Sequence, residues 1–156
     1  MPANGNRLRL PACWERERMS HPNLDLVLNA YRAFENGDMA AAREALADDF
    51  VLHAPGRGPM SGEIQGRDAA MARWQRQIDL LGGIPYKAEE YDVAVTDDHV
   101  IQLANVTAEV GGKTFTYSTC NVWRVRDGKI VEARAHIYDL YAWDEFWARL
   151  SEQDAG

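Results

Sequence analysis

The chain has 156 residues, of which 46% are hydrophobic and 26% charged, and its formal net charge at pH 7 is −7. These values are typical of one globular domain that can bury a core without a disulfide or a metal ion. The acidic balance argues against nucleic acid or an anionic membrane as a partner, because both are bound by basic surfaces.

Apolar residues at helical spacing predict three helices in the first half of the chain. Asn23 is placed to cap the first helix, Asp38 to cap the second, and Gly82-Gly83 to end the third. The predicted helices span residues 24–36, 39–46 and 66–81.

Strands dominate the rest of the chain. The segment DDFVLHA, residues 48–54, predicts one strand between the second and third helices, and four longer segments rich in Val, Ile, Thr, Tyr and Trp follow the third helix. Gly111-Gly112 and Asp127-Gly128 are two-residue hairpin turns, which antiparallel strands prefer. The long strands are expected over residues 86–95, 100–110, 113–126 and 129–139, before a short aromatic helix over 141–150. This order predicts an α+β fold in which helices cover the concave face of a curled antiparallel sheet and enclose a cavity.

The cysteines and the N-terminus indicate the compartment. Cys13 and Cys120 are too few for a disulfide framework and predict free thiols. Residues 1–18 lack the apolar run of a signal peptide, and no later segment approaches the length of a membrane span. We therefore expect a cytoplasmic protein. Its parts are an N-terminal extension (1–21), one domain (22–150) and a C-terminal tail (151–156).

The segment VLHAPGRGPMSG, residues 51–62, raises the question of a phosphate site. It lacks the G-x-x-x-x-G-K-[ST] spacing, and after Gly56 and Gly58 the next glycine comes one residue too late for G-x-G-x-x-G. We therefore expect a connection across the mouth of a pocket, with Arg57 and Arg67 in surface salt bridges. The histidines and cysteines also lack the spacing of metal ligands, so neither a metal nor another cofactor is expected.

Three segments resemble the SnoaL-like and ketosteroid isomerase-like branch of the nuclear transport factor 2-like superfamily. They read AYRAFENGDMAAAREALADDFVLHAPG, GEIQGRDAAMARW and NVWRVRDGKIVEARAHIYD. The resemblance covers about residues 22–150 and implies a curved antiparallel sheet wrapped by three N-terminal helices into a conical barrel with a central pocket. It also implies a homodimer. The activities that it implies range over isomerisation, cyclisation, dehydration and epoxide hydrolysis, and some members are not enzymes.

The machinery of the ketosteroid isomerases is mostly missing. Matching ADDFVLHAPG onto their motif places Ala54 where they keep the general base, and alanine cannot accept a proton. Their donor tyrosine on the first helix matches Ala30, beside Tyr31. Their protonated aspartate matches Asn121, whose amide can still donate a hydrogen bond to a carbonyl oxygen. The residues therefore do not predict a ketosteroid isomerase.

The segment RAHIYD resembles a run in limonene epoxide hydrolases but is one residue longer. Alignment from Arg134 places Ala135 at their catalytic aspartate, and alignment from Asp139 places His136 there, so that activity is not predicted either. A one-residue bulge exchanges the faces of a strand. With a bulge, His136 turns into the pocket, and the orientation of Tyr138, two residues later, stays open between the pocket and the outside. Without a bulge, His136 lies on the convex face, where the alternative interpretation is a dimer contact.

Other candidates surround the expected pocket. Alternation places Tyr117, Asn121 and Trp123 on one face of their strand, while His53 ends the first strand on the face opposite Ala54. Trp74 and Tyr31 have two interpretations, as core residues or as ligand contacts. The expected catalytic residues are His136, Asn121 and His53. The expected pocket residues are Tyr31, Trp74, Ala54, Tyr117, Trp123 and Tyr138.

Three hypotheses for function follow. In the first, a small enzyme acts on a hydrophobic carbonyl compound of polyketide, terpenoid or steroid type: His136 or His53 moves a proton, and Asn121 with Tyr31 stabilises the enolate oxygen. Isomerisation, cyclisation and dehydration share this first step. In the second, the pocket binds a small apolar molecule without catalysis. In the third, the domain is a dimerising structural module whose pocket is filled by its own aromatic residues.

Overall fold

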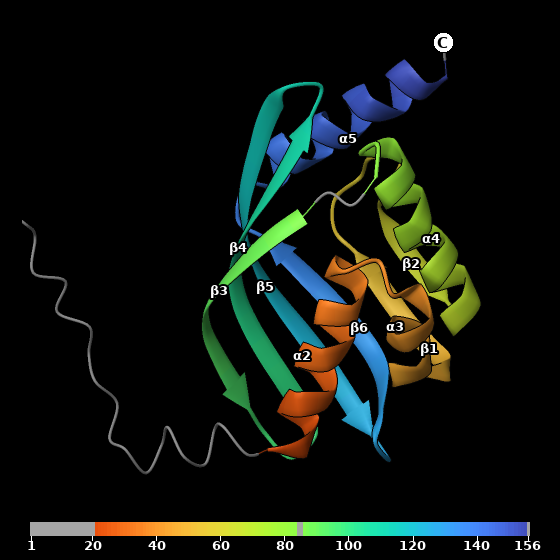
Figure 1. The fold of residues 1–156 in the computed structure, drawn as a ribbon, viewed down its shortest axis with the longest axis vertical. Coiled ribbons are helices and arrows are strands. Elements are labelled where there is room, and N and C mark those ends of the chain that lie inside the picture. Colours follow the sequence, from red (N-terminus) through yellow and green to blue (C-terminus); the bar gives the residue numbers. More distant parts are fainter. Residues whose placement is uncertain (1–20, 84–85, 156) are drawn as a thin grey trace, which may run out of the picture.

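The computed structural model describes residues 21–83 and 86–155, which form a curved sheet with helices packed against it (Figure 1). The helices are α2 (Pro22–Glu35), α3 (Met39–Ala45), α4 (Arg67–Leu80) and α5 (Leu140–Asp154). The strands are β1 (Leu46–Ala54), β2 (Gly62–Gln65), β3 (Tyr86–Val95), β4 (His99–Val110), β5 (Lys113–Arg126) and β6 (Lys129–Ile137). The predicted α+β fold is confirmed.

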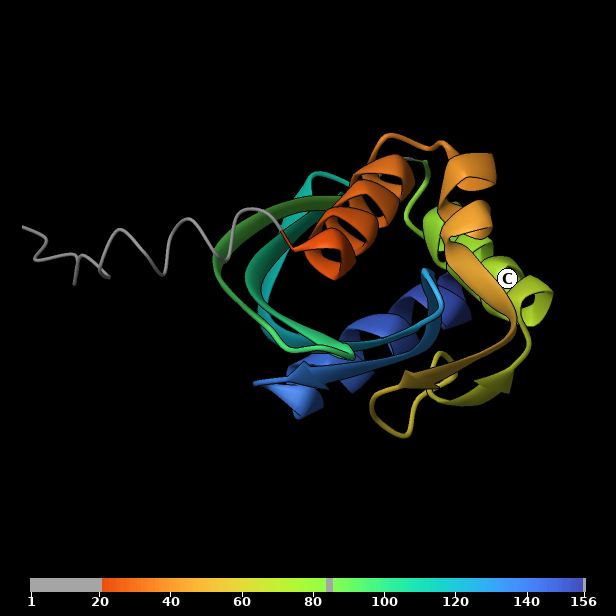
Figure 2. The same cartoon turned by 90° about the horizontal axis from the view of Figure 1, so that it is seen from below.

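The six strands form one sheet in the order β2-β1-β6-β5-β4-β3. Its pairs are antiparallel except for β1 and β6, which run parallel with Leu46 opposite Ile130 and His53 opposite Arg134. The sheet curls without closing, and α2, α3 and α4 lie across its concave side (Figure 2). The parallel pair was not predicted, because it joins the first long strand to the last and leaves no local turn signal.

Local hydrogen bonds explain where two of the helices begin. Asp38 caps α3 by accepting from the backbone N–H of Ala41 at 3.0 Å, as predicted. The prediction that Asn23 caps the first helix was wrong. His21 takes that position, with Nδ1 accepting from the backbone N–H of Asn23 at 3.2 Å, and Asn23 instead donates from Nδ2 to the carbonyl of Asp97.

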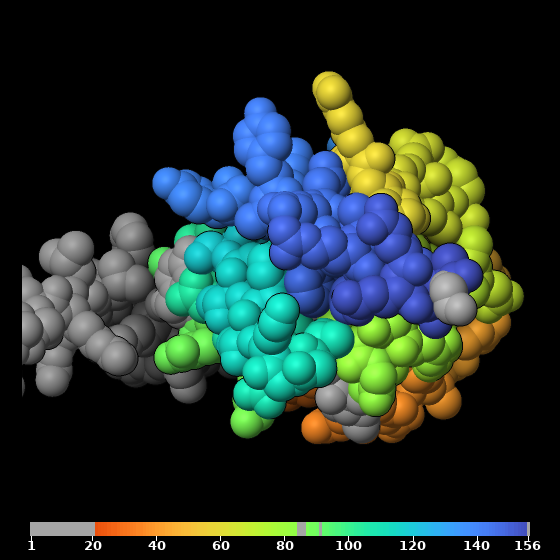
Figure 3. Space-filling model, turned by 90° about the horizontal axis from the view of Figure 1, so that it is seen from above, coloured from red at the N-terminus to blue at the C-terminus, as the bar shows by residue number. Residues whose placement is uncertain are grey.

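Two clusters of buried side chains form the core. The larger lies between the sheet and the three N-terminal helices, and Val27, Phe50, Val100 and Ile130 are completely buried in it. The smaller lies under α5 and contains Met60, Leu80, Leu81, Ala108, Trp143, Trp147 and Leu150. Figure 3 shows α5, in dark blue, lying across this end of the molecule beside the teal β4–β5 hairpin.

Two elements differ most from the prediction. The short edge strand β2 was expected as loop, because four residues bounded by Gly62 and Gly66 carry little pattern; its partner is β1. α5 continues to Asp154 rather than Leu150, because the polar residues after Leu150 still favour helix. Most of the predicted extension, including Cys13, lies outside the described residues, while Cys120 is a free thiol. In the part of the chain that the structure describes, no helix is both long enough and apolar enough to cross a bilayer.

Candidate functional site

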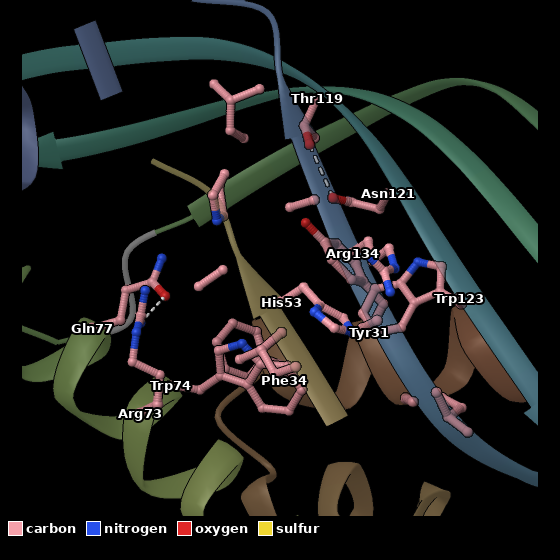
Figure 4. A pocket seen from close by; sticks show the side chains of 18 of the residues that line it. Tyr31, Phe34, His53, Arg73, Trp74, Gln77, Thr119, Asn121, Trp123 and Arg134 are labelled. Carbon is pink, nitrogen blue, oxygen red and sulfur yellow. Dashed lines mark hydrogen bonds between the residues drawn. The ribbon is translucent and has the colours of Figure 1, made fainter. Parts of the chain in front are cut away.

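A cavity of about 130 Å³ lies between the concave face of the sheet and the helices. Its lining comes from seven elements: α2, α3, β1, α4, β5, β6 and α5. Most of the lining is apolar. The labelled polar side chains include Arg73 and Gln77 on α4, Thr119 and Asn121 on β5, and His53 and Arg134 on the neighbouring strands β1 and β6 (Figure 4).

Aromatic rings form much of the wall. Trp74 of α4 packs against Phe34 and Phe50, with ring centroids 5.8 Å apart in each pair. Tyr117 of β5 meets Trp143 of α5 edge to face at 4.8 Å. These packed rings fix the shape of the cavity, because buried aromatic side chains have few alternative rotamers.

A chain of hydrogen bonds crosses the sheet wall. Thr119 Oγ1 donates to Asn121 Oδ1 at 2.9 Å, and Asn121 Nδ2 donates to Gln102 Oε1 at 3.2 Å. Gln102 is completely buried and donates in turn from Nε2 to Glu90 Oε1 at 2.8 Å. The four residues lie on three neighbouring strands, β3, β4 and β5, and Gln102 and Asn121 are direct partners in the ladder. Thr119 and Asn121 border the cavity, whereas Gln102 and Glu90 stand behind them.

A second polar group lies on α4. Arg73 donates from Nη1 to Gln77 Oε1 at 2.8 Å and from Nε to the carbonyl of Met60 at 3.0 Å. These bonds hold the guanidinium against the segment before β2. The Arg73–Gln77 pair thus connects α4 to the segment before β2 and also forms a polar part of the cavity wall (Figure 4).

Two tyrosine hydroxyls remain protonated near neutral pH. Burial, and after it the charges of Glu35 and Glu90, raise the pKa of Tyr31 above its ordinary value. Burial likewise raises the pKa of Tyr117. Burial and the charge of Glu90 also raise the pKa of Glu35, although the backbone N–H of Ala88 donates to it at 3.1 Å. Both phenols line the cavity as neutral groups that can donate a hydrogen bond.

His53 borders the cavity at its rim, beside a cluster of charged groups. Its Nδ1 lies 3.4 Å from Glu63 Oε2 and its Nε2 lies 3.2 Å from Glu132 Oε1. Glu132 also pairs with Arg134 at 2.6 Å and Arg124 at 3.3 Å. Burial alone would raise the pKa of Glu132, but Arg134, Arg124 and His53 outweigh it and lower the pKa. Both nitrogens of His53 therefore face carboxylates and not the cavity.

The loop after β1 binds a carboxylate, and the carboxylate belongs to the chain itself. Asp144 of α5 accepts from the backbone N–H of Arg57 at 2.9 Å through Oδ2, and from that of Gly58 at 3.2 Å through Oδ1. Gly56 has φ +91, and a Cβ built on it would lie 1.9 Å from Asp144 Oδ1. Because Pro55 and Trp143 border the cavity on either side of this contact, the loop and α5 together close one end of it.

The structure brings together most of the residues expected at the pocket. Asn121 and His53 border the cavity, as do Tyr31, Ala54, Trp74, Tyr117 and Trp123. His136 and Tyr138 do not: His136 is exposed, and Tyr138 is 92% exposed. The reason is register. In β6, Ala135 stays opposite Asn121 and Ile137 opposite Thr119, and the one irregularity with β5 lies at the far end, between Arg124 and Val125.

Several residues at the site were missed at the level of sequence. Arg73 and Gln77 stand four apart on α4, a spacing that could have suggested a pair. Gln102 stands between Ile101 and Leu103 in an apolar strand segment, and a polar residue at such a position was the available signal of a role. Glu90 and Glu132 carried no such signal. In the described residues, no group of three His, Cys, Asp or Glu side chains is arranged to hold a metal ion.

Residues 27–133 match the sequence profile of the SnoaL-like domain, which is more than half of the chain. The chain belongs to the SnoaL-like domain family. This family, of nuclear transport factor 2-like fold, includes polyketide cyclases and isomerases. The resemblance seen in the sequence is thereby confirmed.

Similar proteins agree with this assignment. An uncharacterised protein of Mycobacterium tuberculosis is 27% identical over 126 residues, which are 81% of this chain and 96% of that protein. The structure of Bal32a, from a soil-derived mobile gene cassette, is 38% identical with a TM-score of 0.75, over 81% of this chain and 96% of that one. A nuclear transport factor 2-like protein of Burkholderia xenovorans, 21% identical with a TM-score of 0.68 over 81% of this chain and 95% of that one, shares the fold.

Proposed function

We propose that this SnoaL-like domain binds one small, mainly apolar molecule and holds an oxygen atom of that molecule at Asn121. The observation that carries the proposal is the cavity of about 130 Å³, whose walls are largely aromatic and aliphatic and whose sheet side bears the Thr119–Asn121 pair. Binding sites of small molecules commonly combine apolar walls with a few placed polar groups.

The volume limits the ligand. A dry engineered cavity of about 150 Å³ in another protein binds benzene. A cavity of about 130 Å³ therefore suits a molecule of about one six-membered ring. A polyketide, terpenoid or steroid of several rings needs a wider site, which only a movement of the loop or of α5 would supply.

The polar groups favour an oxygen that accepts hydrogen bonds. Asn121 uses one N–H on Gln102 and retains a second, while Tyr31 and Tyr117 are neutral donors at the same cavity. A carbonyl oxygen pairs with such donors, whereas a cation would find no carboxylate among the lining residues.

Binding is favoured over proton transfer because no histidine nitrogen faces the cavity. His136 is exposed on the other face of β6, and both nitrogens of His53 face Glu63 and Glu132. A specific observation nevertheless supports acid–base chemistry as the second candidate. His53 borders the cavity with Glu132 behind it, so a turn of its ring would give a base already oriented by a carboxylate.

Benzaldehyde and styrene test the binding proposal, because they have the same shape and differ in one oxygen. We expect the wild type to bind both in isothermal titration and to prefer benzaldehyde after correction for its lower hydrophobicity. Asn121→Leu should weaken benzaldehyde about tenfold, as one lost hydrogen bond in an apolar site predicts, and leave styrene unchanged. Ala135→Leu, which fills the cavity, should abolish both. Failure of the wild type to bind either molecule would refute the proposal.

Cyclohexanone in D₂O tests the second candidate without knowledge of the natural substrate. An enzyme that removes a proton beside a carbonyl accelerates exchange of the α-hydrogens, which NMR detects. We expect an enzyme to raise the exchange rate above that in buffer. If His53→Gln abolishes this acceleration and His136→Gln preserves it, His53 is the base. No acceleration by the wild type would leave binding as the function.

We also propose a homodimer through the convex face of the sheet. Leu103, Cys120 and Val122 are apolar or weakly polar residues of this face and are only half-buried in the single chain. Analytical ultracentrifugation tests this: we expect twice the mass of the chain, and Val122→Asp should give the mass of one chain.

A further inference from the structure

The polarity of the hydrogen-bond chain behind the cavity depends on one charge, that of Glu90. A carboxylate only accepts, so the amide of Gln102 must present Nε2 to Glu90, which leaves Oε1 for Asn121. Asn121 must then present Nδ2 to Gln102 and Oδ1 to Thr119, and the Thr119 hydroxyl must donate. The opposite arrangement would place the Gln102 amide oxygen against the carboxylate, so that two acceptors would face each other with no proton between them.

We propose that Glu90, acting through Gln102, is a positioning residue that fixes which hydrogen-bonding groups the cavity offers to a ligand. The Thr119 proton is engaged by Asn121, so the ligand meets the oxygen of Thr119 as an acceptor. The ligand meets Asn121 as a donor, through the N–H that Gln102 leaves free. This inference rests on the proposed function, because it concerns the ligand of the same cavity.

The backbone explains how an exposed residue reaches a buried amide. Glu90 pairs with Ala104 and Val93 pairs with Gln102, and a register shift between Glu90 and Asp92 separates the two pairs. Ala104 and Gln102 lie on the same face of β4, so the long side chain of Glu90, which stands opposite Ala104, reaches Gln102 along that face. Its Oε1 lies 2.8 Å from Gln102 Nε2 while the residue remains exposed. A single exposed residue thus controls two amides and a hydroxyl on two further strands.

Fixed polarity has a consequence for selection. A hydroxyl group on a ring can accept from Asn121 and donate to Thr119 at once, whereas a methyl group of the same size can do neither. With glutamine at position 90, the neighbouring amide can face Gln102 with either its NH₂ or its oxygen. Both directions of the chain then become possible, and the cavity loses its single arrangement of donor and acceptor.

Phenol and toluene test the inference, because they match in shape and heavy-atom count. The quantity measured is the ratio of their association constants with the full chain. We expect Glu90→Gln to lower the phenol-to-toluene ratio about fivefold to tenfold with toluene affinity unchanged. Glu89→Gln, an exposed neighbour on the same strand, is the matched control and should preserve the ratio.

A spectroscopic readout accompanies the affinities. In ¹⁵N-labelled protein, the side-chain amide signals of Gln102 and Asn121 should shift in Glu90→Gln and not in Glu89→Gln. If Asn121→Leu lowers the phenol-to-toluene ratio and Glu90→Gln does not, the positioning role is wrong and the binding proposal stands. If the wild type binds neither probe, the binding proposal fails and the inference fails with it.

Discussion

The contact between Asp144 and the loop after β1 should contribute strongly to stability. Replacing Asp144 by alanine removes the acceptor of three hydrogen-bond contacts, at 3.1 and 2.9 Å from the N–H of Arg57 and 3.2 Å from that of Gly58. A hydrogen bond to a charged group contributes about 1.5–3 kcal/mol. The three share one half-buried carboxylate, and water can reach the exposed Arg57 N–H after the substitution. We therefore expect a loss of about 3 kcal/mol in the free energy of unfolding.

Urea unfolding followed by tryptophan fluorescence measures this loss, because Trp143 and Trp147 lie buried on the same helix. Glu145→Ala is the matched control. Glu145 is the next residue of α5 and pairs with Arg149 on the surface, so this substitution should cost less than about 0.5 kcal/mol.

Formate provides a second readout. The emptied loop still presents its backbone N–H groups, so formate should restore part of the stability of Asp144→Ala and leave the wild type unchanged. If Asp144→Ala unfolds within about 0.5 kcal/mol of the wild type, the carboxylate does not hold the loop and the reasoning is refuted.

Three further predictions follow from the same structure. Gly56→Ala should lower the free energy of unfolding by about 3 kcal/mol or more in chemical unfolding, because backbone strain at φ +91 adds to the clash of the new Cβ with Asp144. Gly66 has the same φ, but a Cβ built there meets no atom within 4 Å, so Gly66→Ala should show only the strain of about 1–2 kcal/mol. Glu132→Gln should lower the free energy of unfolding by an amount that is constant near neutral pH and shrinks as the pH falls below about 4.5. The reason is that a carboxylate with a lowered pKa stabilises the fold above its unfolded-state pKa and loses this stabilisation when it is protonated. A stability difference between variant and wild type that grows in acid would contradict this prediction. Trp74→Ala should cost about 3–5 kcal/mol and enlarge the cavity enough to bind naphthalene, which thermal shift would detect, whereas no gain of binding would show that the site collapses.

The sequence predicted the fold well because its signals are local. The hairpin turns at Gly111-Gly112 and Asp127-Gly128 and the long β-branched segments between them fix neighbouring strands of one sheet. Alternation along β5 correctly placed Tyr117, Asn121 and Trp123 on one face, toward the cavity.

The site was predicted less completely because it depends on contacts between distant segments. The sheet face to which His136 points depends on whether β6 contains a bulge. The pairing of β6 with β5 decides this, and the sequence of β6 alone does not show that pairing. The carboxylate held by Arg57 and Gly58 comes from α5, and the partner of Gln102 comes from β3. Neither contact has a spacing that sequence reasoning could have read.

The parallel pairing of β1 with β6 sets the order in which this chain can fold during synthesis. β1 leaves the ribosome early, but in the described sheet its neighbours are the four-residue β2 and β6, the last strand in chain order. At roughly 5–20 residues per second, the stretch between Leu46 and Ile130 takes roughly 4–17 seconds to make. During that interval the strand that carries Phe50 and Leu52 lacks its neighbour β6, so its apolar side chains stay incompletely covered until the sheet is almost finished.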